Sequence, residues 1–372
     1  MTLPVLKPGT EAEVAEAIRA ATGPLVPQGA ATRGATREGQ VLDLSGLTGI
    51  TLYEPGALTL IARAGTPLAE IEATLAAEGQ RLAFEPSDWR GLLGTVGQPT
   101  IGGAVAANIS GPRRVQAGAA RDACLGLRFV DGRGEVLRNG GRVMKNVTGY
   151  DLVRLLAGSW GRLGAITEVS LKLQPTPPAA ATLTLPWEGA ARAVAAMAAA
   201  LGSPFDVTGA AAHAGLGVAL RLEGFDGSVR YRAGKLAALL APFGMAQADH
   251  DREAVAALWS GLRDVRPLQG LPGELWRFSV RPSQAPAILE RLGGEAMLDW
   301  GGGLIWVVLT EGTDARALAR PYEGHATLIR ASADTRARLP RQEPLAPGLA
   351  RIAEGVRASF DPDGRLAGRD GP

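Results

Sequence analysis

The sequence predicts a mixed α+β fold with two domains and a C-terminal extension. Its 372 residues exceed the usual size of one domain. Helix-like and strand-like segments alternate without a repeat, and three prolines within residues 174–178 favour an extended linker. We therefore expect a first domain at residues 1–178, a smaller α+β cap domain at 179–340, and a C-terminal helix and tail at 341–372 that return to the first domain.

In the first domain, Thr10 and Glu13 have the spacing of a capping box, Pro67 suits the first turn of a helix, and Gly79 suits a helix end. Together with apolar residues at helical spacing, these signals predict helices at 10–21, 67–79 and 150–156. β-Branched or alternating residues predict strands at 25–27, 41–44, 50–53, 59–64, 125–130, 135–138 and 166–173. The strands at 125–130 and 135–138 flank a glycine-containing loop and should form a hairpin.

The second domain is richer in alanine. Its patterns predict helices at 189–201 and 231–240 and strands at 218–222, 276–280 and 304–309. Such alternation indicates a compact α+β domain with an antiparallel sheet. A last helix is predicted at 346–360, with an apolar stripe formed by Leu349, Ile352, Ala353 and Val356.

Composition excludes several classes of function. The net charge of +2 gives no overall field for nucleic acid. No run of about 18 apolar residues predicts a membrane span, and the first residues lack the pattern of a signal peptide. The one cysteine, Cys124, permits no internal disulfide and fits a reducing compartment. We expect a cytoplasmic protein in which Cys124 lies in the core.

Two glycine-rich segments are candidate phosphate sites. Residues 97–114 read GQPTIGGAVAANISGPRR, and glycines beside Thr100 could offer bare main-chain N–H groups to an anion. The alternative is a tight turn that packs small residues. Residues 28–34, QGAATRG, directly follow a predicted strand and form a second candidate. A phosphate-bearing cofactor could accept hydrogen bonds from the main-chain N–H groups of both segments.

These blocks do not fit a Rossmann fingerprint or a P-loop, because their glycines are spread over three separate segments. Residues 27–34, 100–114 and 145–177 together resemble the FAD-binding domain of the vanillyl-alcohol oxidase and p-cresol methylhydroxylase (PCMH) superfamily. Residues 111–114 and 118–151 are most similar to the FAD-binding subunits of bacterial glycolate oxidases. The resemblance implies a PCMH-type domain of two subdomains with a smaller α+β cap.

The resemblance also implies a set of residues that hold FAD. The expected cofactor-binding residues are Pro27, Gln28, Gly29, Ala30, Ala31, Thr32, Thr100, Ile101, Gly102, Gly103, Asn108, Ser110, Gly111, Gly118 and Ile166. No histidine lies in the three blocks, so we expect non-covalent FAD. Arg113 and Arg114 could neutralise phosphate or dock a partner, or be solvated surface residues. Lys145 and Tyr150 could face the flavin or organise the turn before the helix.

Independent catalysis has weaker support. Related 2-hydroxy-acid dehydrogenases use clustered histidines with an acidic residue to bind metal, whereas His213, His250 and His325 form no ligand-pair spacing here. We therefore expect no metal site and assign no catalytic residue. The related GSEGTLG pattern reads GSWGRLG at residues 158–164, and a terminal NPG signature is replaced by LAGR at 366–369.

Three functional hypotheses follow. The first is an FAD-binding subunit of a glycolate oxidase complex, which takes part in oxidation of glycolate, a small 2-hydroxy acid, to glyoxylate. Its partners would be a catalytic flavoprotein subunit and an iron–sulfur subunit, since one cysteine is too few to ligate a cluster. Those partners could attach it to a membrane. The others are a free-standing FAD-dependent 2-hydroxy-acid dehydrogenase and a scaffold subunit with a vestigial flavin site.

Overall fold

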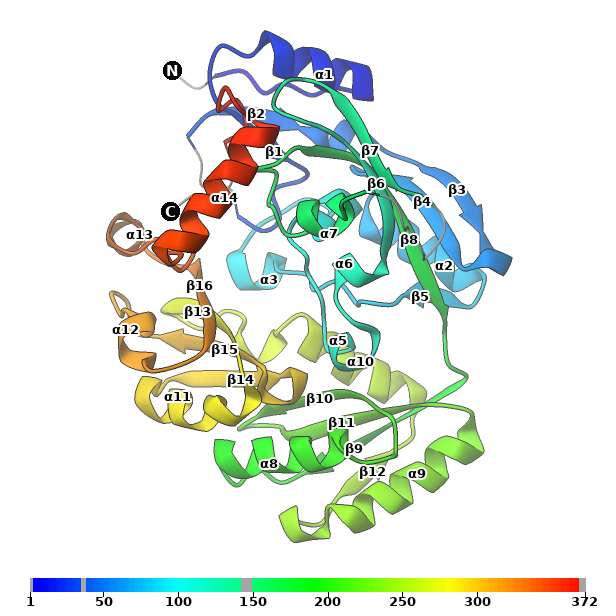
Figure 1. Ribbon diagram of the computed structural model, residues 1–372. Coiled ribbons are helices and arrows are strands. Elements are labelled where there is room, and N and C mark those ends of the chain that lie inside the picture. Colours follow the sequence, from blue (N-terminus) through cyan, green and yellow to red (C-terminus); the bar gives the residue numbers. More distant parts are fainter. Residues whose placement is uncertain (1–2, 35–37, 142–148, 368–372) are drawn as a thin grey trace. The chain divides into compact units, whose positions relative to one another are not determined.

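The protein is described by a computed structural model for residues 3–34, 38–141 and 149–367. It divides into two compact units (Figure 1). Unit 1 comprises Met1–Ser110, Gly118–Thr176 and Leu345–Pro372, and unit 2 comprises Gly111–Ala117 and Pro177–Pro344. Helices and strands are mixed in both units, which confirms the predicted α+β class.

Unit 1 contains two sheets. A parallel pair is formed by β1 (Leu25–Gln28) and β2 (Gln40–Asp43). An antiparallel sheet has the order β3-β4-β8-β6-β7, and β5 also pairs with β8. Its strands are β3 (Ile50–Glu54), β4 (Thr59–Arg63), β5 (Gln80–Leu82), β6 (Cys124–Val130), β7 (Val136–Gly140) and β8 (Ala165–Pro175). The predicted hairpin at 125–138 is confirmed as the β6–β7 pair.

The helices of unit 1 are α1 (Glu11–Ala20), α2 (Leu68–Ala77), α3 (Arg90–Leu93), α4 (Ile101–Ala106), α6 (Ala120–Ala123), α7 (Leu152–Leu156) and α14 (Pro347–Phe360). Thr10 caps α1 as predicted, because its hydroxyl accepts from the N–H of Glu13 at 3.2 Å. Glu13 itself accepts from Gly9 N at 2.7 Å, one residue before the expected partner. The contact from Thr10 satisfies an N–H group that the first helical turn leaves open, and the contact from Glu13 ties Gly9 to the start of the helix.

One apolar core joins α2 and α4 to the larger sheet of unit 1. Ile71 from α2, Val105 from α4 and Leu60 and Leu171 from the sheet are fully buried in it. Each such side chain contributes about 1.5–3 kcal/mol through removal from water. This packing fixes α4 against β4, and it thereby positions the glycine-rich segment that the sequence singled out.

The C-terminal segment belongs to unit 1. Phe360 at the end of α14 packs on Phe129, with ring centroids 6.1 Å apart. Beyond it, Leu25 N donates to Arg365 O and Ala367 N donates to Leu25 O, each at 2.7 Å, so the tail runs beside β1. The predicted apolar stripe of α14 is only partly buried: Leu349 is 58% exposed and Ile352 is 65% exposed.

Unit 2 is built on one antiparallel sheet with the order β12-β9-β11-β10-β14-β15-β13-β16. Its strands are β9 (Ala179–Leu185), β10 (Val207–His213), β11 (Gly217–Gly224), β12 (Gln247–Asp249), β13 (Glu274–Val280), β14 (Glu295–Asp299), β15 (Leu304–Leu309) and β16 (Gly324–Arg330). The antiparallel sheet predicted for this part of the chain is confirmed.

The helices of unit 2 are α5 (Arg114–Ala117), α8 (Ala190–Leu201), α9 (Asp226–Leu239), α10 (Arg252–Arg263), α11 (Ala285–Leu292), α12 (Ala315–Ala319) and α13 (Ala333–Arg338). Residues of α8, α9, α11 and α12 share an apolar core with alternate residues of the sheet. Helix α9 begins five residues earlier than its predicted start at 231, and Asp226 and Arg230 pair across its first turn (Nε–Oδ2 2.9 Å).

The two arginines of the GPRR segment lie in unit 2. Arg113 is 1% exposed and pairs with the carboxylate of Glu223, which is 8% exposed. Its neighbour Arg114 stacks over the ring of Trp300 at 4.4 Å, and the Trp300 indole N–H donates to Gly111 O at 3.0 Å. The interpretation of Arg113 as a solvated surface residue is therefore wrong. A buried ion pair and an aromatic contact hold this short segment in unit 2.

Among the residues that the structure describes, no helix is long and apolar enough to cross a membrane.

Candidate functional site

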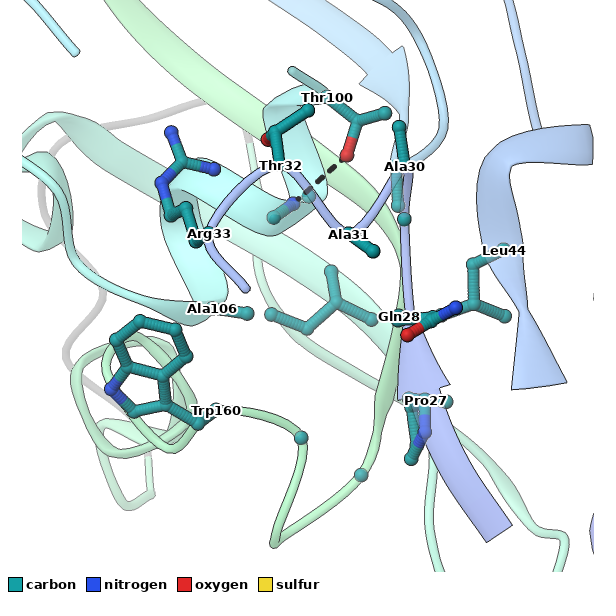
Figure 2. A pocket seen from close by; sticks show the side chains of 18 of the residues that line it. Pro27, Gln28, Ala30, Ala31, Thr32, Arg33, Leu44, Thr100, Ala106 and Trp160 are labelled. Atoms are coloured by element: carbon teal, nitrogen blue, oxygen red, sulfur yellow. Dashed lines mark hydrogen bonds between the residues drawn. The ribbon is translucent and has the colours of Figure 1, made fainter. Parts of the chain in front are cut away.

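Unit 1 contains a cavity with about 770 Å³ of empty space, counted out to its open mouth (Figure 2). Most of its wall comes from three chain segments: the loop after β1, helix α4, and the stretch that leads into β8. The lining residues are Pro27, Gln28, Gly29, Ala30, Ala31, Thr32, Arg33, Gly34, Leu44, Ala64, Thr100, Gly102, Gly103, Ala106, Trp160, Gly161, Gly164, Ala165 and Ile166. Most are small, so the main chain forms much of the wall.

The loop after β1 presents main-chain donors. Ala31 has a left-handed conformation with φ of 52°, and Thr32 O accepts from the Thr95 hydroxyl at 2.8 Å, which holds the loop in place. Among the described residues, the N–H groups of Ala30, Ala31 and Thr32 have no hydrogen-bond partner. Consecutive open N–H groups in a turn of this kind form a cradle for an anion.

The start of α4 does not present open donors, which corrects our expectation for this segment. Ile101 N donates to Thr66 O at 3.0 Å, Gly102 N to Ala64 O at 2.8 Å, and Gly103 N to the Thr100 hydroxyl at 3.3 Å. Neither glycine has a positive φ. Gly102 is required by proximity instead, because a Cβ there would lie 2.5 Å from Ala64 Cβ.

Three non-glycine residues in or beside the cavity adopt strained backbone conformations. Ala31, Asn108 and Trp160 have φ values of 52°, 49° and 56°. A left-handed conformation costs a non-glycine residue on the order of 1–3 kcal/mol, and such residues gather at functional sites. Trp160 is held there by a hydrogen bond from its N–H to Ala106 O at 2.9 Å. Of the eight described non-glycine residues with a positive φ, Ala31 and Trp160 line the cavity.

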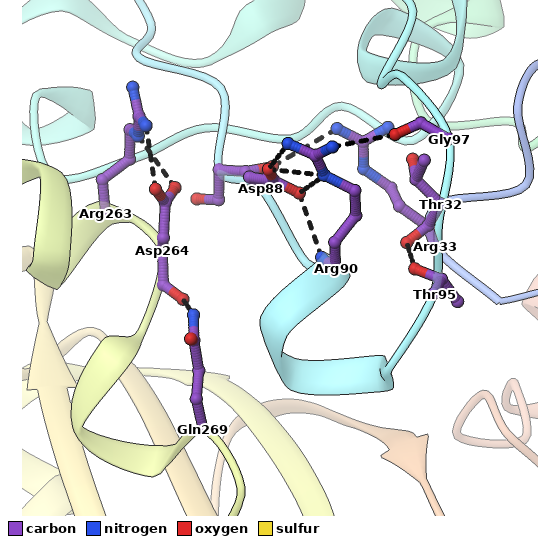
Figure 3. A network of polar contacts seen from close by, with 10 residues as sticks. Thr32, Arg33, Asp88, Arg90, Thr95, Gly97, Arg263, Asp264 and Gln269 are labelled. Carbon is purple, nitrogen blue, oxygen red and sulfur yellow. Dashed lines mark hydrogen bonds and ion pairs between the residues drawn. The ribbon is translucent and has the colours of Figure 1, made fainter.

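Arg33 is the charged residue of the cavity wall. Its side chain is buried, with 7% of the residue exposed, and burial lowers its pKa to about 10, while nearby Asp88 acts in the opposite direction. The guanidinium still carries its charge at neutral pH. Asp88 is held by Arg90, whose Nη2 lies 2.7 Å from Oδ2 (Figure 3). The cavity is thus positively charged on one side.

The structure brings many of the predicted cofactor residues together at this cavity. They are Pro27, Gln28, Gly29, Ala30, Ala31, Thr32, Thr100, Gly102, Gly103 and Ile166. Ile101 is fully buried in the core beside it. The remaining predicted residues do not line the cavity.

Those remaining residues shape the turns that follow α4. The Asn108 side-chain oxygen accepts from Arg121 N at 3.0 Å, and the Ser110 hydroxyl accepts from Ala120 N at 2.9 Å. Gly118 has a φ of +80°, and Gly111 belongs to unit 2. These contacts give the residues a role in local structure.

Several lining residues were not among the predicted cofactor-binding residues. They are Arg33, Gly34, Leu44, Ala64, Ala106, Trp160, Gly161, Gly164 and Ala165. Arg33 and Gly34 are contiguous with the predicted loop, and Trp160 is one of two residues that depart from the related GSEGTLG pattern, so the sequence contained a signal for each of them. Leu44 and Ala64 carried none, because only long-range packing brings them to the cavity.

Other candidate residues lie elsewhere. Tyr150 is 87% exposed, and Lys145 is outside the described residues. Cys124 is buried at the start of β6 as predicted, and burial raises the pKa of its thiol to about 12. His213 Nε2 lies 2.8 Å from Glu295 Oε1 in unit 2. Within the described part of the chain, no group of three or more His, Cys, Asp or Glu residues could hold a metal ion.

Comparison with known proteins defines the class first. Residues 3–140 match the model of an FAD binding domain. The structure of p-cresol methylhydroxylase with substrate bound has the same fold, with a TM-score of 0.69 at 15% sequence identity over 97% of this chain and 87% of that chain. The protein is therefore an FAD-linked oxidoreductase of the PCMH type.

A closer relative identifies the family. The chain is 38% identical over 347 residues to glycolate oxidase subunit GlcE of Escherichia coli (strain K12), covering 92% of this chain and 90% of that protein. It belongs to the GlcE family of glycolate oxidase subunits. Glycolate oxidase subunit GlcD of Bacillus subtilis (strain 168) is 33% identical over 170 residues, which cover 44% of this chain and 35% of GlcD.

Proposed function

We propose that this chain is the FAD-binding subunit of a glycolate oxidase complex and takes part in the oxidation of glycolate to glyoxylate through its flavin. The observation that carries the proposal is the extent of the match to subunit GlcE, which spans both units and is not confined to the FAD binding domain. When bound, FAD supplies an acceptor for the hydride of a 2-hydroxy acid.

The residues of the cavity fit FAD. Its diphosphate needs donors, and the open N–H groups of Ala30, Ala31 and Thr32 supply them beside the positive charge of Arg33. The predicted cofactor residues of the cavity wall would hold the diphosphate and flavin, with Ile166 acting through its main chain. Among the described residues, the lining includes neither histidine nor cysteine, which supports non-covalent FAD.

The proposal assigns a role to each part of the chain. Residues 1–178, apart from the segment 111–117 that belongs to unit 2, form the FAD-binding domain, 179–340 form the cap, and 341–372 form the helix and tail that complete the first domain. The partners are a catalytic flavoprotein subunit and an iron–sulfur subunit of the same complex. Cys124 is a single buried thiol and cannot ligate a cluster, so a cluster requires a partner. We propose a cytoplasmic location, with membrane association through partners.

The test begins with the purified chain reconstituted with FAD. A visible flavin spectrum after gel filtration supports the proposal, and a colourless protein refutes it.

The chain is then assayed with glycolate and a dye acceptor, alone and with its two partner subunits. Turnover that requires the partners supports a subunit role. Brisk turnover by the chain alone supports a free-standing dehydrogenase, and full complex activity in a variant that cannot bind FAD supports a scaffold.

A further inference from the structure

Arg33 places a positive charge in the wall of the cavity without an evident counter-charge. Its guanidinium has one hydrogen bond among the described residues, from Nη2 to Ser87 O at a long 3.3 Å. Its Nε has no hydrogen-bond partner there. A buried charge with so few partners is costly unless another group completes its environment.

The nearest acid does not complete it. Asp88 accepts from Arg90 at both carboxylate oxygens, with Arg90 Nε 2.8 Å from Oδ2 and 3.1 Å from Oδ1 (Figure 3). Arg90 also donates to Gly97 O at 2.9 Å, so this pair is locked to the neighbouring loop. The negative charge of Asp88 is therefore largely neutralised by Arg90.

The surroundings of Arg33 suit an anion. None of the lining residues in the described part of the chain is an aspartate or a glutamate. The open N–H groups of Ala30, Ala31 and Thr32 directly precede Arg33 in the chain. A Cβ added to Gly103 would lie 3.5 Å from Arg33 Nη1, so the guanidinium reaches across to the start of α4. Figure 2 shows Arg33 beside Thr32 at the edge of the cavity.

We propose that Arg33 is the counter-charge for the diphosphate of FAD, acting together with the N–H groups of the loop that precedes it. This inference rests on the proposed function, because it assumes that FAD occupies the cavity. It assigns part of the discrimination between FAD and an unphosphorylated flavin to this side chain. Arginine suits this role because its planar donors match phosphate oxygens.

The test compares FAD with riboflavin, which lacks both phosphates. The purified apoprotein is titrated with each flavin, and the dissociation constants are measured by flavin fluorescence for wild type, Arg33→Met and Arg33→Lys. We expect Arg33→Met to weaken FAD binding by about 10- to 100-fold, as for a lost charge-assisted contact, and to change riboflavin binding less than twofold. Arg33→Lys should recover much of the FAD affinity. High salt should weaken FAD binding more in wild type than in Arg33→Met.

Arg63→Met is the matched control, because Arg63 is an exposed arginine at the end of β4. It should bind both flavins as wild type does. Equal loss of FAD and riboflavin affinity in Arg33→Met would show that Arg33 only supports the loop, and would overturn the inference. If Arg33→Met does not fold, Arg33→Gln replaces it as the variant without the charge: a lower ratio of FAD to riboflavin affinity than in wild type supports the inference, and an unchanged ratio refutes it. Wild-type protein that binds no FAD refutes the proposed function instead.

Discussion

Replacing Gly102 by alanine tests whether close packing, rather than backbone freedom, requires glycine at the start of α4. The added Cβ would lie 2.5 Å from Ala64 Cβ, 2.8 Å from Ala64 O and 2.9 Å from Ala64 Cα. Two of these atoms belong to the main chain, so no rotamer change relieves the contact. The same carbonyl accepts the Gly102 N–H at 2.8 Å, and a shift of α4 would weaken that bond.

The opposing effects can be compared. Overpacking costs about 1–3 kcal/mol, and a weakened hydrogen bond adds about 1 kcal/mol. Alanine in place of a helical glycine recovers about 1 kcal/mol. The free energy of unfolding should therefore fall by about 1–3 kcal/mol in Gly102→Ala.

Gly103→Ala is the control in the same helix. Its Cβ would meet only side-chain atoms at more than 3 Å, with Thr100 Oγ1 at 3.1 Å and Arg33 Nη1 at 3.5 Å. We expect its stability to stay within about 1 kcal/mol of wild type. Urea unfolding of the apoproteins, followed by circular dichroism, measures both variants. Equal stability of Gly102→Ala and Gly103→Ala would refute the packing argument.

Three further outcomes are expected. Burial raises the pKa of the Cys124 thiol to about 12, so the folded state favours the protonated thiol. The free energy of unfolding should therefore fall by up to about 1.4 kcal/mol per pH unit between about pH 9 and pH 12. Urea unfolding at alkaline pH should show this fall in wild type and a smaller fall in Cys124→Ala. Glu223→Ala should cost about 3–5 kcal/mol in urea unfolding, because it leaves Arg113 buried without its carboxylate. Asp361 accepts from two main-chain N–H groups of the tail at 2.8 Å, so Asp361→Ala should cost about 2 kcal/mol and speed hydrogen exchange there, whereas exposed Asp363→Ala should have little effect.

The sequence predicted helix ends well where a single capping residue determines them. Thr10 caps α1, and Gly79 lies two residues beyond the end of α2. The strands β10 and β14 were not predicted, because the first is mostly alanine and glycine and the second is a short acidic and apolar run. These residues have weak intrinsic preferences for a strand, and pairing with neighbouring strands overrides those preferences. That pairing is known only from the tertiary structure.

Contacts between residues far apart in the chain limit how much of the site can be predicted from the sequence. Arg113 and Glu223 are 110 positions apart in the chain, so their pairing could not be inferred from the GPRR segment. Charged residues are expected at the surface because most of them are exposed. This expectation is wrong for Arg113, because pairing with one carboxylate offsets the cost of removing its charge from water. The cavity shows the same limit: its contiguous residues were predicted as a set, whereas Ala64 reaches it through the packing of β4.

The two glycine-rich segments reach the cavity by different physical means. In the loop after β1, the main chain turns through a left-handed Ala31 and leaves donors open. In α4, the main-chain donors are used internally, and Gly102 serves the approach of the helix to Ala64. The cap at Thr100 accounts for one of these donors, the N–H of Gly103, and long-range contacts with main-chain carbonyls account for the N–H groups of Ile101 and Gly102. The loop and Arg33, rather than the glycine pair, are therefore where changes should alter recognition of phosphate.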